Sequence, residues 1–354
     1  MKRLLGLGLS LTLAVSMLAG CGSSSSGSSS SANSNENSSS GAESAETVVI
    51  QMGHANPGKE DDPYNKYCEL FGEHLSELSG GKYQVEILAD GQLGGERDMY
   101  EGLQMGTIDA ALVTTMIVAN FVPEYQFMDL PYLFLDYDDV HTVLDDDEIM
   151  ADLEEASYNN YNVKILGYGE NGFRKVLNSV KPINSLADYS GMKIRTPESS
   201  TYLDAFRAMG ANPTAMAFSE LYTGLSQKTV DGLELPIASI NTKKFYEVAG
   251  YLSGTDHMFT AYAVCISGNF WDNLTEEEQG WFQQAADMAT EEERVHVQAV
   301  EQKFLDEMVD AGLEYNEVEN IDEIIAVCEG TWDNYVDTIG AERFDKILTA
   351  LGRK

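Results

Sequence analysis

The chain has 354 residues, of which 58 are acidic and 22 are basic, so its formal net charge is −36. Binding to nucleic acid or to anionic lipid headgroups needs clustered cations, so this composition argues against both as partners. The segment 47–354 is longer than one hydrophobic core usually supports, and two lobes are therefore expected.

The first residues predict export. A basic start (Lys2 and Arg3) precedes an uncharged apolar run over 4–19, somewhat shorter than the roughly 20 residues of a membrane-spanning helix. The run ends in Leu-Ala-Gly-Cys, which resembles a bacterial lipobox, so we expect Cys21 to carry a lipid; an ordinary signal peptide that contains a cysteine is the alternative. The sequence thus predicts a lipoprotein signal peptide over 1–20 and a lipid-anchored, flexible Ser/Gly-rich tether over 21–46, on the outer face of the cytoplasmic membrane.

The following part of the chain alternates between strand and helix patterns. Asp62 is placed to cap a helix with Pro63 in its first turn, and Gly80 lies just past its end. A second helix is expected over 95–106. The expected strands are 47–53, 83–89, 108–115 and 162–169. This βαβαβ order predicts a mostly parallel sheet flanked by helices.

A second alternation of strand and helix patterns follows. Thr275 and Glu278 form a capping-box pattern at the start of a helix that extends to Asp310 and is long enough to span two lobes. The other expected helices are 199–209, 219–227 and 321–338, and the expected strands are 174–180, 191–196, 211–215 and 261–267. The chain is accordingly divided into lobe I, residues 47–171 and 261–300, and lobe II, residues 172–260 and 301–354.

Few residues carry a recognisable chemistry. After Cys21, three cysteines remain: Cys68, Cys265 and Cys328. All lie in apolar patterns and are expected to be small buried hydrophobic residues. The alternative is that two of them form a disulfide and the third is a free thiol. HExxH, CxxC and GxxxxGK[ST] motifs are absent, and no cofactor or metal is expected. The glycine-rich stretch 90–98 reads as a turn before a helix.

Two arginines are the strongest site candidates. Arg174 and Arg195 both fall at strand edges near glycines, close to the expected change of lobe. Open α/β sheets bind ligands beyond their strand ends, and a guanidinium offers a planar fork that matches a carboxylate. The alternative is that each arginine forms a structural salt bridge with one of the many acids.

Six motifs carry a family resemblance. They are GGERDMYEGLQMGTIDAALV, NFVPEYQFMDLPYLF, ENGFRKVLNS, GMKIRTPES, GANPTAMAFSELYTGLSQKTVDGLELP and KFYEVAGYLS, in order over residues 48–340. Together they resemble the DctP-type substrate-binding proteins of TRAP transporters. The resemblance implies a two-lobed, periplasmic-binding-protein-like α/β fold with a hinge and a long helix across both lobes. It also implies capture of a small carboxylate and its delivery to a two-subunit membrane permease driven by an ion gradient.

The resemblance also assigns roles to single residues. Arg195 matches the family arginine that clamps the ligand carboxylate, Arg174 matches a second arginine that faces the ligand, and Phe218 matches an aromatic that packs on it. Where the family usually reads D-G-Q-E-N-P, this chain has Leu233 and Leu235 in place of the two amides.

Two consequences follow for specificity. Either Leu235 faces the cleft and shifts specificity, or it packs into a lobe core and a neighbour such as Asn212, or water, takes over the role of the amide. Members that bind sialic acid carry an acid and an arginine where this chain has Thr114 to Ile117, so Thr114 borders a site for a different acid. The ligand can still be a short linear acid, a uronate, an aldonate or another sugar acid.

The expected protein is therefore a monomeric, lipid-anchored extracytoplasmic receptor of a TRAP transporter and not an enzyme. A receptor that feeds an ATP-driven importer is the first alternative. A surface hydrolase that uses two of the many acids is the second.

Overall fold

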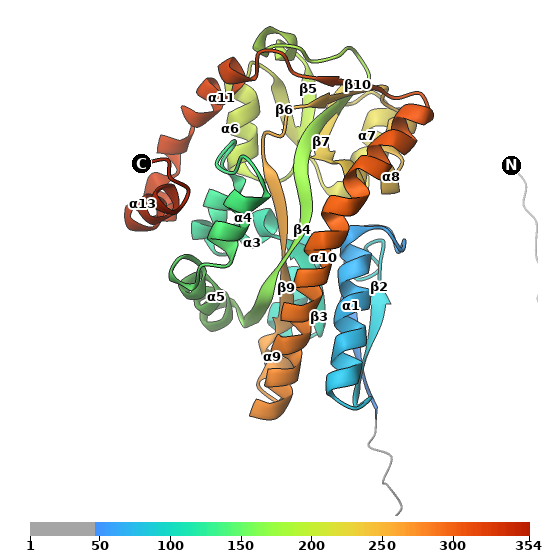
Figure 1. Ribbon diagram of the computed structural model, residues 1–354, viewed down its shortest axis with the longest axis vertical. Coiled ribbons are helices and arrows are strands. Elements are labelled where there is room, and N and C mark those ends of the chain that lie inside the picture. Colours follow the sequence, from blue (N-terminus) through green and yellow to red (C-terminus); the bar gives the residue numbers. More distant parts are fainter. Residues whose placement is uncertain (1–46) are drawn as a thin grey trace, which may run out of the picture. The chain divides into compact units, whose positions relative to one another are not determined.

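The computed structural model describes residues 47–354 (Figure 1). The expected signal peptide (1–20), the tether (21–46) and the lipidated Cys21 lie outside the described residues. In the part of the chain that is described, no helix combines the length and the apolar character needed to cross a membrane.

Ten strands of the described chain form one sheet, whose main path has the order β2-β1-β3-β9-β4-β7-β5-β6, with β8 on β4 and β10 on β8. Their bounds are β1 Val48–Gly53, β2 Tyr83–Leu88, β3 Ala110–Thr114, β4 Val163–Asn178, β5 Lys193–Thr196, β6 Asn212–Ala215, β7 Gly232–Pro236, β8 Tyr251–Gly254, β9 Phe259–Ser267 and β10 Glu314–Glu317. The pairs β1–β2, β1–β3, β5–β6 and β5–β7 are parallel, as expected. The expectation of a mostly parallel sheet fails at its centre, because β9 is antiparallel to β3 and β4, and β4 is antiparallel to β7.

Strand β4 differs from the sequence-based expectation. Two strands with a glycine-rich turn between them were expected over 162–180, but one strand of 16 residues runs through the region. The glycines mark bulges, since the register with β9 shifts between Ile165 and Tyr168 and again between Glu170 and Gly172. Gly169 is required by a close approach, because a Cβ there would lie 2.2 Å from the ring of Tyr262. As a result β4 runs without a break from one lobe into the other (Figure 1).

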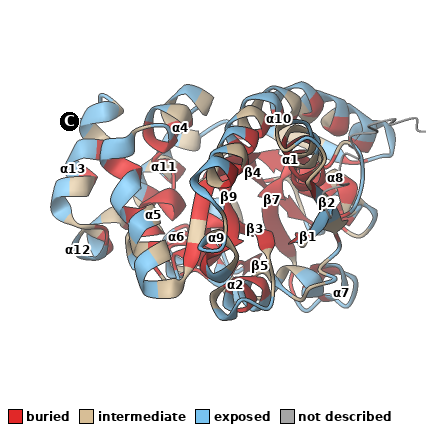
Figure 2. Ribbon diagram, turned by 90° about the horizontal axis from the view of Figure 1, so that it is seen from below, coloured by how far each residue is buried: buried red, intermediate tan, exposed pale blue. Residues whose placement is uncertain are grey.

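Helices cover the sheet (Figure 2). The α-helices are α1 Pro63–Leu78, α2 Glu96–Met105, α3 Thr115–Val118, α4 Tyr137–Leu144, α5 Asp147–Tyr161, α6 Ser200–Ala208, α7 Leu221–Ser226, α8 Ile237–Thr242, α9 Gly268–Trp271, α10 Glu276–Asp310, α11 Ile321–Glu329, α12 Val336–Ile339 and α13 Ala341–Ala350. Short 3-10 helices occupy Pro123–Asp129, Leu186–Tyr189, Phe218–Glu220, Phe245–Glu247 and Trp332–Asn334.

The long helix is confirmed. Helix α10 has 35 residues and begins at a capping box, in which the hydroxyl of Thr275 accepts from the Glu278 N–H and the Glu278 carboxylate accepts from Thr275. It packs against α1, β4 and α8, and so spans both lobes (Figure 1). The helix expected over 321–338 is instead broken: α11 ends at Glu329, and a 3-10 turn follows at Trp332–Asn334. The indole N–H of Trp332 donates to the Pro131 carbonyl at 2.9 Å, which holds this turn in place.

The two-lobed α/β fold class is thus confirmed. Three apolar cores lie around the sheet: one includes α2, α5 and α6, a second lies between α1, β1 and α10, and a third surrounds β7 and α8. Cys68, Cys265 and Cys328 are buried in the first two cores as free thiols, as the apolar patterns predicted. Strands β4 and β9 pair along their length and provide backbone connections between the lobes.

Candidate ligand-binding site

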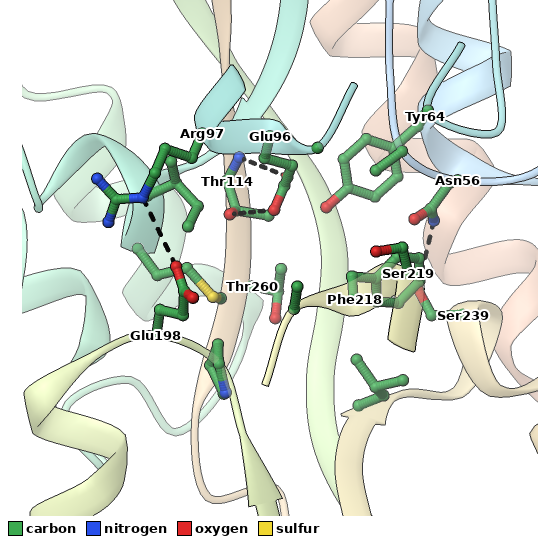
Figure 3. A pocket seen from close by; sticks show the side chains of 18 of the residues that line it. Asn56, Tyr64, Glu96, Arg97, Thr114, Glu198, Phe218, Ser219, Ser239 and Thr260 are labelled. Atoms are coloured by element: carbon green, nitrogen blue, oxygen red, sulfur yellow. Dashed lines mark hydrogen bonds and ion pairs between the residues drawn. The ribbon is translucent and has the colours of Figure 1, made fainter. Parts of the chain in front are cut away.

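A cavity of about 610 Å³ lies between the two lobes, and Figure 3 shows some of the side chains that line it. Several lining residues follow directly on strand ends. Asn56 comes just after β1, Thr114 ends β3, Pro197 follows β5 and Met216 follows β6. Carboxyl ends of parallel strands are where open α/β sheets bind ligands, so the topology of each lobe directs its loops to this cavity.

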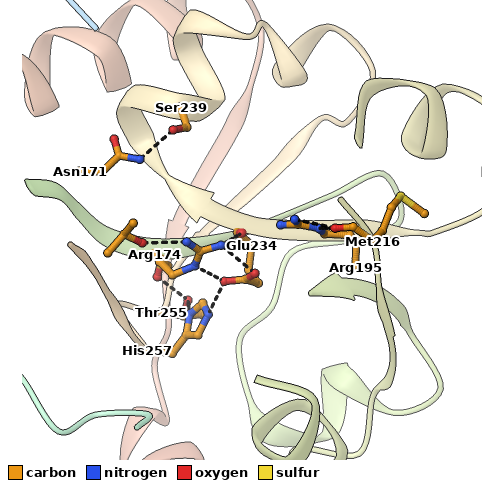
Figure 4. Close-up of polar contacts among 9 residues, drawn as sticks. Asn171, Arg174, Arg195, Met216, Glu234, Ser239, Thr255 and His257 are labelled. Carbon is orange, nitrogen blue, oxygen red and sulfur yellow. Dashed lines mark hydrogen bonds and ion pairs between the residues drawn. The ribbon is translucent and has the colours of Figure 1, made fainter. Parts of the chain in front are cut away.

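Arg174 lines the cavity but is already paired. Its side chain is 2% exposed, and Nε and Nη2 donate to the Glu234 carboxylate, Nη2 at 2.9 Å. Nη1 donates to Thr260 Oγ1 at 2.7 Å. Figure 4 shows Arg174 beside Glu234 and His257. Burial alone would lower the pKa of Arg174, but the charge of Glu234 raises it above its usual value. His257 Nε2 lies 3.3 Å from the same carboxylate, so Glu234 holds both groups in place.

Arg195 lines the same cavity in a different state. It is 3% exposed, and its Nε and Nη2 donate to the Met216 carbonyl at 2.9 and 2.7 Å. Within the described chain it forms no ion pair, whereas Arg174 does. Burial, with the neighbouring charge of Arg174, lowers the pKa of Arg195 to about 10. A buried guanidinium with spare donors and no carboxylate partner is suited to receive an anion.

Acidic groups occupy the side of the cavity formed by β3 and α2. The Glu96 carboxylate accepts from Thr114 N and from Thr114 Oγ1, both at 3.0 Å (Figure 3). Burial raises the pKa of Glu96. Thr114 therefore borders the cavity, as expected, but its hydroxyl proton is already donated to Glu96.

Two ion pairs cross between the lobes at the edge of the cavity. Arg97 Nε lies 3.6 Å from Glu198 Oε2, and Lys243 Nζ lies 3.0 Å from Asp90 Oδ1. Each joins a residue near α2 to a residue of the other lobe. The described conformation therefore has the lobes in contact around the cavity.

The remaining candidate residues are Phe218, Leu235 and Asn212. Phe218 lines the cavity, with Lys243 Nζ 5.6 Å from its ring centre. Leu235 also lines it, although it is only 4% exposed and packs into the core around β7, whereas Leu233 is wholly inside that core. Asn212 does not reach the cavity: its side chain is exposed and donates to the Gly191 carbonyl at 3.1 Å.

The placement of Asn212 has a simple cause. Asn212 begins strand β6, but the cavity lies at the other end of that strand, where Met216 is found. Four residues of strand span about 13 Å, which is too far for an asparagine side chain. The suggestion that Asn212 replaces the missing amide is therefore not supported.

Several lining residues were not among the sequence-based candidates: Tyr64, Asn56, Glu96, Asn171, Ser239, Lys243 and Thr260. Asn171 directly precedes Gly172 in the stretch that also holds Arg174, so its neighbours drew attention to the right segment. The others come from loops and helices whose approach to the cavity depends on long-range packing. No group of three or more His, Cys, Asp or Glu side chains in residues 47–354 is arranged to hold a metal ion.

Two α/β lobes that enclose a cavity with a buried guanidinium define a class of protein, the two-lobed solute-binding proteins. The family model described as bacterial extracellular solute-binding protein, family 7 (DctP), matches residues 52–338, and the chain belongs to this family. The resemblance to the DctP-type substrate-binding proteins of TRAP transporters is thereby confirmed, and with it an extracytoplasmic location.

Relatives and solved structures agree with this assignment. The 2,3-diketo-L-gulonate-binding periplasmic protein YiaO of Escherichia coli K12 is 36% identical over 247 residues, 70% of this chain and 75% of that protein. The sugar acid binding protein DctPAm of Advenella mimigardefordensis, in complex with galactonate, has a TM-score of 0.82 and 31% identity, covering 86% of this chain and 98% of that chain. A TRAP periplasmic solute-binding protein of Polaromonas sp. JS666, bound to D-erythronate, has a TM-score of 0.81 and 33% identity, covering 85% and 98%.

Proposed function

We propose that this protein is a lipid-anchored receptor that captures a small organic or sugar acid through its carboxylate and delivers it to the membrane subunits of a TRAP permease. Arg195 is the carboxylate clamp, Arg174 lies beside it, and Phe218 packs on the ligand. Leu235 and Thr114 border the ligand without donating to its carboxylate. The protein releases its ligand unchanged and is not an enzyme.

The observation that carries this proposal is the state of Arg195. A buried guanidinium without a carboxylate partner is costly unless an anion arrives. Arg195 is 3% exposed, lines the cavity and donates only to a backbone carbonyl. A ligand carboxylate supplies the missing charge, and exclusion of water between the lobes strengthens the contact.

The anchor and the transport partner rest on other grounds. The lipobox-like sequence before Cys21 supports lipidation there, and the Ser/Gly-rich tether would let a monomeric receptor reach a permease in the same membrane. Membership of the DctP family favours an ion-driven permease over an ATP-driven importer. It also favours a receptor over a surface hydrolase.

A thermal-shift series tests the carboxylate requirement. Saturation at 100 times Kd adds about 2.7 kcal/mol of stability, so a bound acid gives a clear rise in Tm. We expect a rise with at least one member of a panel of dicarboxylates, uronates and aldonates. The matched neutral alditol, such as galactitol for D-galactonate, should give none. An equal rise with the acid and its alditol would refute carboxylate recognition.

A further inference from the structure

A polar cluster outside the two arginines borders the cavity. It consists of Asn56, from the loop after β1, Asn171, from β4, and Ser239, from α8, and is called the amide–serine cluster here. The three residues are 4%, 5% and 1% exposed. Figure 3 shows Asn56 beside Ser239, and Figure 4 shows Asn171 and Ser239 apart from Arg174 and Arg195.

A β-bulge brings Asn171 to the cavity. Glu170 pairs with Ala261 and Gly172 pairs with Thr260, so Asn171 is the extra residue with no partner on β9. In a regular strand, residues three apart face opposite sides, and Asn171 would point away from Arg174. The bulge, with Gly172 at φ 98°, resets the alternation so that Asn171 and Arg174 line one cavity.

The hydrogen bonds of the cluster are incomplete. Asn171 Nδ2 donates to Ser239 Oγ at 2.9 Å, and Asn56 Nδ2 donates to the same oxygen at 3.3 Å. Ser239 therefore accepts twice, and its own proton has no acceptor in the described chain. Asn171 Oδ1 is buried and has no donor among residues 47–354. Buried polar groups are normally paired, so the cluster offers one donor and one acceptor to a ligand.

This pair of groups fits an alcohol and not a carboxylate. A hydroxyl can donate to Asn171 Oδ1 and accept from Ser239 at the same time, whereas an ionised carboxylate has no proton to donate. The charges of the cavity point the same way. Its other cations are already paired: Arg174 with Glu234, Arg97 with Glu198 and Lys243 with Asp90. Only Arg195 is left to neutralise a carboxylate.

We propose that Asn171 and Ser239 form a hydroxyl-recognition subsite, so that the cavity selects hydroxylated monocarboxylic acids over dicarboxylates. This inference rests on the proposed function, because Arg195 must hold the single carboxylate while Asn171 receives a hydroxyl further along the same molecule. Asn56 positions Ser239 by occupying one of its lone pairs.

Calorimetric titration with two matched sets of acids tests the subsite. The four-carbon set is D-erythronate, succinate and butyrate, and the six-carbon set is D-galactonate, adipate and hexanoate. In at least one set the hydroxylated acid should bind about tenfold or more tightly than the other two, since a lost buried hydrogen bond costs about a factor of ten. Asn171→Leu, which keeps the volume and removes both polar atoms, should abolish most of that preference. Ser239→Ala should reduce it without a change of shape.

The controls separate this subsite from the carboxylate clamp. Asn334→Leu changes an exposed asparagine outside the cavity and should leave all affinities unchanged. Preference of the wild-type protein for succinate or adipate would overturn the subsite. An equal loss for all acids in both Asn171→Leu and Ser239→Ala would do the same. If Arg195→Ala binds the acids of both sets as tightly as the wild-type protein does, the carboxylate clamp itself fails, whatever the outcome for Asn171 and Ser239.

Discussion

Arg195 donates two hydrogen bonds to the carbonyl oxygen of Met216, at 2.9 and 2.7 Å, and forms no ion pair within the described chain. The carbonyl fixes the plane of the guanidinium and leaves Nη1 free for another acceptor. Since the group is 3% exposed, water cannot solvate it well. The arrangement orients a positive charge in advance of its anion, which reduces the entropy lost when a ligand binds.

Glu234 should stabilise the folded protein by pairing with the buried charge of Arg174. Removing one partner of a buried ion pair costs about 3–5 kcal/mol, because the other charge is left uncompensated. We expect Glu234→Gln to lower the free energy of unfolding by that amount, measured by urea denaturation. Glu319→Gln, at an exposed position, is the control and should change little. A loss below about 1 kcal/mol would mean that the Arg174–Glu234 pair is not a structural anchor.

Leu235 should influence which acid binds. Leu235 borders the cavity and carries no donor, so an asparagine there would add an amide that prefers some ligands to others. We expect Leu235→Asn to change the ratio of affinities between two acids by about tenfold, measured by calorimetric titration. Leu235→Met preserves volume and apolar character and should keep the wild-type order. An unchanged order in the asparagine variant would assign Leu235 to the core alone.

Glu293 on α10 should make stability depend on pH. Its carboxylate is wholly buried and accepts from Tyr262 and from the Glu170 N–H, and burial, followed by the charge of Glu170, raises its pKa well above the usual value. A carboxyl whose pKa is raised by folding stabilises the folded state below its unfolded pKa of about 4.3, and that contribution is lost as pH rises through the folded value.

Glu293→Gln removes this titration. The difference in unfolding free energy between Glu293→Gln and wild type should therefore move in favour of the variant as pH rises from 5 to 8, by at most about 1.4 kcal/mol per pH unit. Denaturation at each pH measures it. Glu291→Gln, two residues away on the same helix and exposed, should show a constant difference from wild type. A constant difference for Glu293→Gln as well would show that Glu293 does not titrate in this range.

Local sequence patterns predicted the elements well where the cause is local. The cap of α10 is an example, because Thr275 and Glu278 satisfy each other within one turn. The continuity of β4 could not be predicted in this way. Gly169 is needed because the ring of Tyr262, almost a hundred residues away, packs against it. A glycine that permits a close approach and a glycine that makes a turn look alike in sequence.

The binding site shows the same difference between features with a local cause and features that depend on long-range packing. Their positions at expected strand edges singled out Arg174 and Arg195, the family motifs gave them roles, and both line the cavity. The state of each arginine depends on pairing between distant strands: Val176 lies opposite Glu234 in the antiparallel pair β4–β7, which brings the Glu234 side chain to Arg174. The error at Asn212 has a similar origin, because the direction of β6 relative to the cavity is a property of the whole sheet.

Ligand should bring the lobes together. The ion pairs Arg97–Glu198 and Lys243–Asp90 cross the cavity edge in the described conformation, and hinge closure around a ligand forms such contacts. We expect small-angle scattering to show a smaller radius of gyration when a saturating acid is present. The control is Arg195→Ala at the same acid concentration, which should show no compaction. An identical radius for the wild-type protein with and without bound acid would argue against hinge closure.

The central claim, that Arg195 clamps a ligand carboxylate between the lobes, is tested most directly by calorimetric titration of the tightest-binding acid into wild type, Arg195→Ala and Arg195→Lys. Losing one partner of a buried charge pair costs about 2–5 kcal/mol, so Arg195→Ala should weaken binding by roughly 30- to several-thousand-fold. Arg195→Lys should recover little, since an ammonium cannot reproduce the planar fork. Arg207→Ala, at an exposed arginine outside the cavity, should bind as wild type does. An unchanged affinity in Arg195→Ala would contradict the account.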